Sequence, residues 1–480
     1  MAESLQKKTL SGVIWSFTEN FMLQIIQFAI GVLMARILTP GDYGMVGMLS
    51  IFMAISQTLV DSGFSNALTR KVDRTEVDCA TVFYFNIVVG IVLYFVIFFS
   101  APLIADFYKT PLLEDLTKVI ALPLIFNSLC IVQQARLTIK MDFKTQAKIS
   151  VTSSIVTGLS GLAMAYSGFG VWTLAYSSVI GAVVRCILLW WFTHWKPLWT
   201  YSWQSFREMF SYGSKLLTSA LIDTTYSNIY PIIIGRLFSA SELGYYTRAN
   251  AYAALPSTTV SGLLKRVTFP LLCEIQNDDE RLERIYRQLL RLSAFVVFPL
   301  MMGFAALAHP VIVAMITDKW EPCVPYLQIL CFALMWYPIH ALNLNLLQVK
   351  GRSDLFLKLE IIKKIVGVSV ILITFPFGVL YMCVGSVFSS ILCLVINTYY
   401  TGKLIQVGFL MQMRDLLPTI LYSLSMGILV YGVTLLFDSN LLKIAVGMLV
   451  GLLYYPSVAY LTKSSELSYL ISMIKNRKKQ

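Results

Sequence analysis

Charged residues are scarce in this chain of 480 residues: only 13% are Asp, Glu, Lys or Arg, whereas about a quarter of a typical soluble domain is charged. Apolar residues make up 57%, and the mean hydropathy is +0.70. So few charges cannot cover the surface of a soluble protein of this length, and no polar linker divides the chain. The composition therefore excludes a soluble enzyme, a secreted disulfide scaffold and a disordered protein. It indicates a polytopic membrane protein.

Motifs of catalysis and metal binding are also missing. The eight cysteines contain no Cys-x-x-Cys pair, so we interpret them as small buried hydrophobic residues. The chain has no Gly-x-x-x-x-Gly-Lys-[Ser/Thr] phosphate loop, no His-Glu-x-x-His and no Gly-x-Ser-x-Gly. The longest outer loops, near 106–115 and 309–323, are too short for a polymerase or glycosyltransferase site. We therefore expect no enzymatic activity, no metal and no cofactor.

Long apolar runs are abundant. A helix needs about 20 mostly apolar residues to cross the hydrocarbon core of a bilayer. By this measure we predict an all-α membrane protein with about fourteen spans, at 10–36, 43–65, 80–105, 116–139, 149–167, 171–194, 212–236, 244–268, 292–308, 324–348, 357–375, 378–400, 416–437 and 440–462.

Basic residues are distributed unevenly between the two sides of these spans. The termini and the loops on their side hold 30 of the 38 Lys and Arg residues, the opposite side holds seven, and Arg185 lies within a span. This asymmetry predicts that both termini are cytoplasmic. It also explains the net charge of +12 as orientation and contact with anionic phospholipids, so we expect no nucleic-acid partner.

The chain repeats itself at an offset of 200 to 208 residues. The turn 35–44 matches 235–244, with Arg36, Asp42 and Gly44 corresponding to Arg236, Glu242 and Gly244. Pro102-Leu103-Ile104 and Gly170-Val171 recur as Pro310-Val311-Ile312 and Gly378-Val379. Six spans separate the copies, so the two halves have the same orientation, as in transporters with parallel repeats.

The repeat predicts a domain organisation of six plus six plus two spans. We expect an N-terminal lobe at 1–195, an amphipathic interfacial linker at 196–211, a second lobe at 212–400, and two further spans with a basic tail at 401–480. Two similar lobes can rock against each other to expose a central site to either side of the membrane. The residues alone therefore predict a secondary transporter, and we expect a monomer.

Several motifs resemble one family of such transporters, the polysaccharide-exporter branch of the multidrug/oligosaccharidyl-lipid/polysaccharide superfamily. Within that branch the chain is similar to Wzx-type and colanic- and teichuronic-acid exporters. The motifs are Gly12-Val13-Ile14-Trp15, Ala35-Arg36-Ile37-Leu38-Thr39-Pro40-x-Asp42-Tyr43-Gly44, Gly168-x-Gly170-Val171-Trp172, Tyr245-Tyr246-Thr247-Arg248-Ala249 and Arg266-Val267-x-Phe269-Pro270.

The resemblance implies a MATE-like fold and a flippase that moves undecaprenyl-diphosphate-linked oligosaccharide across the inner membrane, for lipopolysaccharide, capsule or exopolysaccharide. Glycosyltransferases or a polymerase of the same pathway would be partners. Two neighbouring functions remain open, a drug or cation antiporter and a lipid II flippase of the same fold. A third alternative, of another class, is a multi-pass polymerase or glycosyltransferase.

Ionisable residues at membrane depth are costly, so they are candidates for function. Glu19 and Asp223 lie within the first spans of the two halves, and we interpret them as candidates for proton or sodium coupling or as acids satisfied by neighbours. Arg185 is the best candidate for contact with a diphosphate, against an internal salt bridge. Arg136 and the pair Lys265 and Arg266 are further candidates, or interfacial anchors.

Neutral polar residues suit the hydroxyl groups of sugars. Tyr226 and Asn228 in the seventh span form one candidate patch; His340, Asn343 and Asn345 in the tenth form another, although a lone histidine is more often a packing residue. The repeated turns at Arg36, Asp42, Gly44, Arg236, Glu242 and Gly244 are interpreted as structural.

Overall fold

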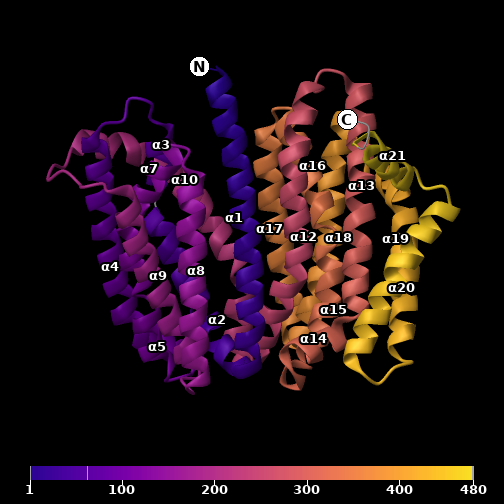
Figure 1. Cartoon of the computed structure of the whole chain (residues 1–480), viewed down its shortest axis with the longest axis horizontal. Coiled ribbons are helices and arrows are strands. Elements are labelled where there is room, and N and C mark those ends of the chain that lie inside the picture. Colours follow the sequence, from indigo (N-terminus) through magenta and orange to yellow (C-terminus); the bar gives the residue numbers. More distant parts are fainter. Residues whose placement is uncertain (1, 62, 478–480) are drawn as a thin grey trace. The chain divides into compact units, whose positions relative to one another are not determined.

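The computed structural model describes residues 2–61 and 63–477, and within them every regular element is a helix (Figure 1). The chain is therefore an all-α membrane protein, as the sequence predicts. It forms two compact units, Met1–Gly244 and Tyr245–Gln480, and we describe each unit by itself.

Unit 1 is built around α2, α4 and the α8–α9 pair. Helix α1 packs along α8, α8 packs on α9, and α4 packs on α5 and α6. Helices α10 and α11 pack on α2. The bounds are α1 Ala2–Ile37, α2 Pro40–Asp61, α3 Phe64–Arg70, α4 Glu76–Tyr108, α5 Leu113–Ile120, α6 Pro123–Ser128, α7 Ile131–Ile139, α8 Phe143–Tyr166, α9 Trp172–Thr193, α10 Trp203–Ser227 and α11 Ile229–Leu237.

Unit 2 is built around α13 and α18. Helix α12 starts in unit 1 and continues into unit 2, where α13 packs on α19 and α15, and α18 packs on α15, α16 and α17. The bounds are α12 Ala240–Glu274, α13 Asp279–Ala306, α14 Ala308–Ile316, α15 Cys323–Leu334, α16 Tyr337–Val349, α17 Ser353–Thr374, α18 Val379–Ile405, α19 Phe409–Thr434, α20 Asn440–Leu461 and α21 Ser465–Arg477, with 3-10 turns η1 Asp318–Trp320 and η2 Phe375–Phe377.

Fewer helices qualify as membrane spans than the sequence predicts. In the described residues ten helices are long and apolar enough to cross a bilayer, or eleven if the pair Leu113–Ser128 and Ile131–Ile139, bent by 42°, is one span. The predicted spans 212–236, 244–268 and 357–375 are helical, as α10–α11, α12 and α17, but they are too polar to qualify. Charged residues within these helices lower their hydropathy.

Two other boundaries differ from the prediction. The span expected at 116–139 is broken into α5, α6 and α7. The span expected at 292–308 is the second part of a longer helix, because α13 runs unbroken from Asp279 to Ala306, with the side chain of Asp278 capping its first turn. The units divide after Gly244, so α10 and α11 fall in unit 1. The lobes expected from the repeat stay a prediction.

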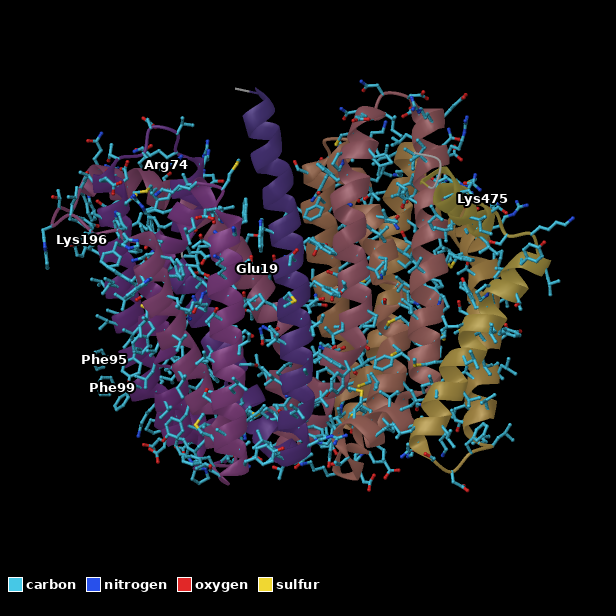
Figure 2. All side chains as sticks on the ribbon, viewed as in Figure 1. Glu19, Arg74, Phe95, Phe99, Lys196 and Lys475 are labelled. Carbon is cyan, nitrogen blue, oxygen red and sulfur yellow. The ribbon has the colours of Figure 1, made fainter. Side chains whose placement is uncertain are left out.

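Unit 1 separates lipid-facing from polar surface. The aromatic side chains of Phe95 and Phe99 project outward from α4 (Figure 2), as expected of residues that contact lipid. Arg74 and Lys196 lie toward the end of the unit at which α1 begins, whereas Glu19 lies about midway along α1 (Figure 2). Cations thus gather at one end of the unit.

The two repeated turns cross each other at backbone distance within unit 1. A Cβ added to Gly44 would lie 1.6 Å from the carbonyl oxygen of Ala240, and one added to Gly244 would lie 1.9 Å from that of Pro40. The two contacts are equivalent in the repeat, because an offset of 200 residues relates Gly44 to Gly244 and Pro40 to Ala240. Near the local pseudo-twofold axis, Gly41 faces Ser241. Only glycine permits this approach, and the contact relates the repeats as an isologous pair.

Replacing Gly44 with alanine should destabilise the protein, because the new methyl group would overlap a backbone carbonyl that has no flexible side chain to move. We expect Gly44→Ala to cost about 1–3 kcal/mol, seen as a lower thermal-unfolding midpoint of the detergent-purified protein. Gly432→Ala is the matched control, because Gly432 is also helical and has no neighbouring atom within 4 Å of an added Cβ. An equal midpoint for both variants would contradict the crossing.

Candidate functional site

A polar site in unit 1 contains Arg185. Arg185 lies on α9, eight residues before its end at Thr193, or about 12 Å along the helix. Its side chain is exposed, and its guanidinium Nη2 donates a hydrogen bond of 3.4 Å to Oε1 of Gln134 on α7. An exposed arginine at this depth is too costly to face lipid, so we infer that it borders a hydrated space.

The second half of this site is a chain of hydrogen bonds from α6 to α2. Asn127 Nδ2 donates to Gln57 Oε1 at 2.8 Å, and Gln57 Nε2 donates to Asp61 Oδ1 at 3.3 Å. Arg185 interacts electrostatically with Asp61, although within the described residues neither group forms an ion pair. We call Gln57, Asp61, Asn127, Gln134 and Arg185 the polar site of unit 1.

Two apolar clusters position these side chains. Val60, beside Asp61, is buried with Leu124 and Ile131, which fixes α2 against α6 and the start of α7. Cys186, beside Arg185, is buried with Leu137, Ile149 and Leu189, which fixes α9 against α7 and α8. The polar residues thus stand on a packed framework.

The polar site of unit 1 can bind an anionic, hydroxyl-rich ligand. Arg185 retains guanidinium donors that no carboxylate of the described residues engages, and such donors suit the oxygens of a phosphate. Each carboxamide of Gln57, Asn127 and Gln134 offers both donors and acceptors. All three are half-buried, so part of each side chain remains accessible to a ligand.

Sequence reasoning singled out Arg185 but missed Asp61, Gln57, Asn127 and Gln134. Gln57 and Asp61 are spaced four residues apart and share one face of α2, which is a usable signal. Asn127 and Gln134 offer none, because the breaks between α5, α6 and α7 reorient them.

Glu19 is a further ionisable group at membrane depth in unit 1. It lies about midway along α1 and is half-buried (Figure 2). Its carboxylate has no hydrogen-bond or ion-pair partner among the residues that the structure describes. Asp223, its counterpart on α10, is exposed and interacts with a neighbour.

Arg136 is held by a structural cluster at the start of α4. Its Nη1 lies 2.7 Å from Oε1 and 2.8 Å from Oε2 of Glu76. Trp195 donates its indole N–H to the same carboxylate at 2.8 Å, and its ring lies 5.5 Å from the Arg136 guanidinium. These contacts favour a structural role for Arg136, in which it holds Trp195 and the start of the linker against α4 and α7.

The candidate sugar residues on α10 face α2. Ser50 Oγ donates to Asn228 Oδ1 at 3.3 Å, and the hydroxyls of Thr58 and Thr224 lie 3.2 Å apart. Tyr226 is half-buried and interacts with a neighbour. In this structure Asn228 therefore has a role in packing α10 on α2.

The candidate sugar residues of unit 2 lie in hydrogen-bond networks, which are buried around Asn343 and Asn345 and partly buried around His340. Asn343 and Gln412 exchange hydrogen bonds of 3.0 and 3.1 Å, and Thr401 joins them. His340 accepts from Asn397 at 3.1 Å and lies 3.2 Å from Ser390 Oγ, an arrangement that fits a neutral ring protonated on Nε2.

Asn345 is 2% exposed, and it pairs with Thr268 at 3.5 Å. With Asn343 1% exposed and Gln412 fully buried, these networks join helices α12, α16, α18 and α19. Hydrogen bonds of this kind stabilise helix packing in membranes. His340, Asn343 and Asn345 stay untested as sugar ligands.

The remaining candidate cations are placed at helix ends or outside the described side chains. Arg236 stacks on Phe107, with its guanidinium 5.0 Å from the ring centroid, and Arg36 also interacts with a neighbour.

Asp42 accepts from the backbone N–H and hydroxyl of Thr39 and so caps α2, and the Ser239 hydroxyl accepts from the backbone N–H of Glu242 in the repeated turn. The side chains of Lys265 and Arg266 lie outside the described residues.

A family model described as "Polysaccharide biosynthesis protein" matches residues 33–325. The chain is 25% identical to the teichuronic acid biosynthesis protein TuaB of Bacillus subtilis, over 90% of each chain. It is 24% identical to the lipopolysaccharide biosynthesis protein WzxC of Escherichia coli, over 82% of this chain and 80% of that one.

Solved structures share the fold. The lipid II flippase MurJ in an inward closed conformation aligns with a TM-score of 0.77 at 14% identity, over 94% of this chain and 98% of that one. An inward-facing MATE family multidrug transporter of the MOP superfamily aligns with a TM-score of 0.61 at 14% identity, over 81% and 96% of the two chains.

If Arg136 serves Glu76, removing either partner should have the same consequence. We expect Arg136→Ala and Glu76→Ala to lower the thermal-unfolding midpoint similarly, with a coupling energy of about 0.5–1 kcal/mol in the double-mutant cycle, because the pair is partly exposed. Binding of undecaprenyl diphosphate should change equally in the two variants. Weaker binding in Arg136→Ala alone would assign Arg136 to the ligand.

Proposed function

The chain belongs to the polysaccharide biosynthesis protein family of the MOP superfamily, and on that premise we propose that it is a flippase for undecaprenyl-diphosphate-linked oligosaccharide. It moves this precursor from the inner to the outer leaflet of the bacterial inner membrane. The cargo then enters assembly of lipopolysaccharide, capsule or exopolysaccharide. Relatives named for teichuronic acid, lipopolysaccharide and succinoglycan support the class of cargo and leave the glycan unspecified.

The observation that carries the proposal is the exposed, carboxylate-free guanidinium of Arg185 within a membrane bundle. A diphosphate headgroup cannot enter hydrocarbon, because burying unpaired charge costs many kcal/mol. A protein that moves it must offer a hydrated path with fixed cations, while the polyprenyl tail stays in lipid. The polar site of unit 1 supplies such a cation, with neutral polar groups beside it.

The orientation follows from the cations. The end of unit 1 that carries Arg74 and Lys196 faces the cytoplasm, in agreement with the 30-to-7 distribution of basic residues (Figure 2). The polar site of unit 1 then lies nearer the cytoplasmic side, where the lipid-linked precursor is made. Alternating access carries the headgroup outward.

Arg185→Ala should reduce transfer of undecaprenyl-diphosphate-linked oligosaccharide between the leaflets of proteoliposomes at least about tenfold, because a charge-assisted hydrogen bond is lost. Arg185→Lys should retain part of the activity. Arg284→Ala, which removes an exposed arginine from the start of α13, is the matched control and should transfer at the wild-type rate. Full transfer by Arg185→Ala would remove Arg185 from the mechanism.

The same proteoliposomes separate the alternatives of the same fold. Transfer of lipid II without transfer of the oligosaccharide precursor would identify a lipid II flippase. Gradient-dependent uptake of ethidium without transfer of either lipid would identify a drug antiporter. Extension of the glycan by the purified protein would identify a polymerase or glycosyltransferase.

Glu19 is the proposed coupling residue, since an unpartnered carboxylate at membrane depth can take up a proton or a sodium ion. We expect transfer by the wild type to accelerate under an imposed proton or sodium gradient, and Glu19→Gln to lose this acceleration while keeping the basal rate. Asp106→Asn, at the exposed outer end of α4, is the control. Gradient dependence that persists in Glu19→Gln, or a wild type indifferent to both gradients, would refute the coupling role.

A further inference from the structure

Carboxamide side chains form two contrasting groups in this protein. In unit 2, Asn343 and Gln412 are almost fully buried, and the two side chains use each other as partners. In unit 1, Gln57, Asn127 and Gln134 are half-buried; Asn127 Oδ1 and Gln134 Nε2 take part in no hydrogen bond within the described residues, and Gln57 uses one N–H and one lone pair of its amide. The first group is buried, whereas the second is partly exposed.

We propose that Gln57, Asn127 and Gln134 bind the hydroxyl groups of the sugar that is attached directly to the diphosphate. This inference rests on the proposed flippase function and names the residues that recognise the sugar. Arg185 holds the diphosphate, and the carboxamides hold the first sugar beside it.

The arrangement of the polar site of unit 1 supports this division. Gln134 is hydrogen-bonded to Arg185, so a ligand oxygen on the guanidinium lies next to the free amide group of Gln134. Gln57 and Asn127 form a continuous chain with Asp61, which interacts electrostatically with Arg185. A glycosyl diphosphate has the same order of groups, with the anion joined directly to a ring that carries neighbouring hydroxyls.

The chemistry of the side chains matches a sugar better than a second anion. A carboxamide donates through its NH2 group and accepts through its oxygen, as a sugar hydroxyl requires. Asp61 repels further negative charge but accepts hydrogen bonds from hydroxyls. A site built to hydrogen-bond hydroxyls discriminates strongly against a ligand that lacks them, because its polar groups are then left unpaired.

Hydrogen bonds between the carboxamides also orient them. Asn127 donates to Gln57, and Gln57 donates onward to Asp61, so the orientation of both amides is fixed. The oxygen of Asn127, and the second N–H and second lone pair of Gln57, remain for a ligand. Fixed polar groups lose less entropy when they bind, which favours recognition of one sugar stereochemistry over another.

The test compares sugar-bearing with bare undecaprenyl diphosphate. Native mass spectrometry of the full-length protein measures competition among undecaprenyl diphosphate and its glucosyl, galactosyl and N-acetylglucosaminyl derivatives. We expect the wild type to prefer at least one sugar-bearing lipid. In Gln57→Leu and Asn127→Leu that preference should fall about tenfold, the effect of roughly one hydrogen bond, with binding of the bare lipid unchanged.

Two further variants provide the controls. Arg185→Ala should weaken binding of bare and sugar-bearing lipid alike. Asn86→Leu removes a carboxamide of the same unit that is fully buried and has no partner in the described residues, so the sugar preference should survive. Thermal unfolding of each variant identifies any loss of fold.

Each outcome decides the proposal. It is overturned if the wild type binds bare lipid as well as every sugar-bearing lipid, if the preference survives in both leucine variants, or if Asn86→Leu also loses it. Failure of the wild type to bind any of the lipids would instead overturn the flippase function on which this inference rests.

Discussion

Polar groups inside a bilayer must find their partners within the protein or in enclosed water, because hydrocarbon offers none. Each unit meets this constraint in its own way. Unit 2 pairs its polar side chains with one another, as in the network of Asn343, Thr401 and Gln412, and with a bidentate contact of 2.7 and 2.8 Å between Arg287 and Asp415. Within the described residues of unit 1, Glu19 has no ion-pair partner, and Arg185 interacts with Asp61 electrostatically without forming an ion pair. The incomplete pairing, more than the presence of charge, marks unit 1 as the place for a charged ligand.

The repeat contributes a second constraint, which acts through the backbone. Gly44 and Gly244 let the two repeated turns cross so closely that each turn's carbonyl occupies the space of a side chain on the other. Such a contact brings equivalent elements of the two halves together and holds the start of α12 beside the start of α2. The match of 35–44 with 235–244 therefore has a structural role, because the two matching turns contact each other.

Much of the fold could be predicted from the sequence, since span length and hydropathy are local properties. The all-α class, most spans and the depth of Arg185 follow from them. The breaks between α5, α6 and α7 could not be predicted, because the apolar run continues through them and packing decides where the chain turns. The roles of individual polar residues could not be predicted either. Asn343 and Asn127 both lie in apolar stretches of sequence, but Asn343 is buried and Asn127 is only partly buried. Burial and partners, which distinguish them, are tertiary properties.

Three helices are long enough to span a membrane but too polar to qualify as spans. Helices α10, α12 and α17 have the length of a span, but residues such as Asp223, Arg248 and Glu360 make them too polar to be surrounded by lipid. A helix of this kind is stable within a bilayer only where neighbouring helices or water cover its charges. Hydropathy alone therefore does not separate lipid-facing from interior helices, because α17 exposes Ile365 and Ile373 although it is too polar to qualify, whereas half of the apolar window in Cys323–Val349 is buried.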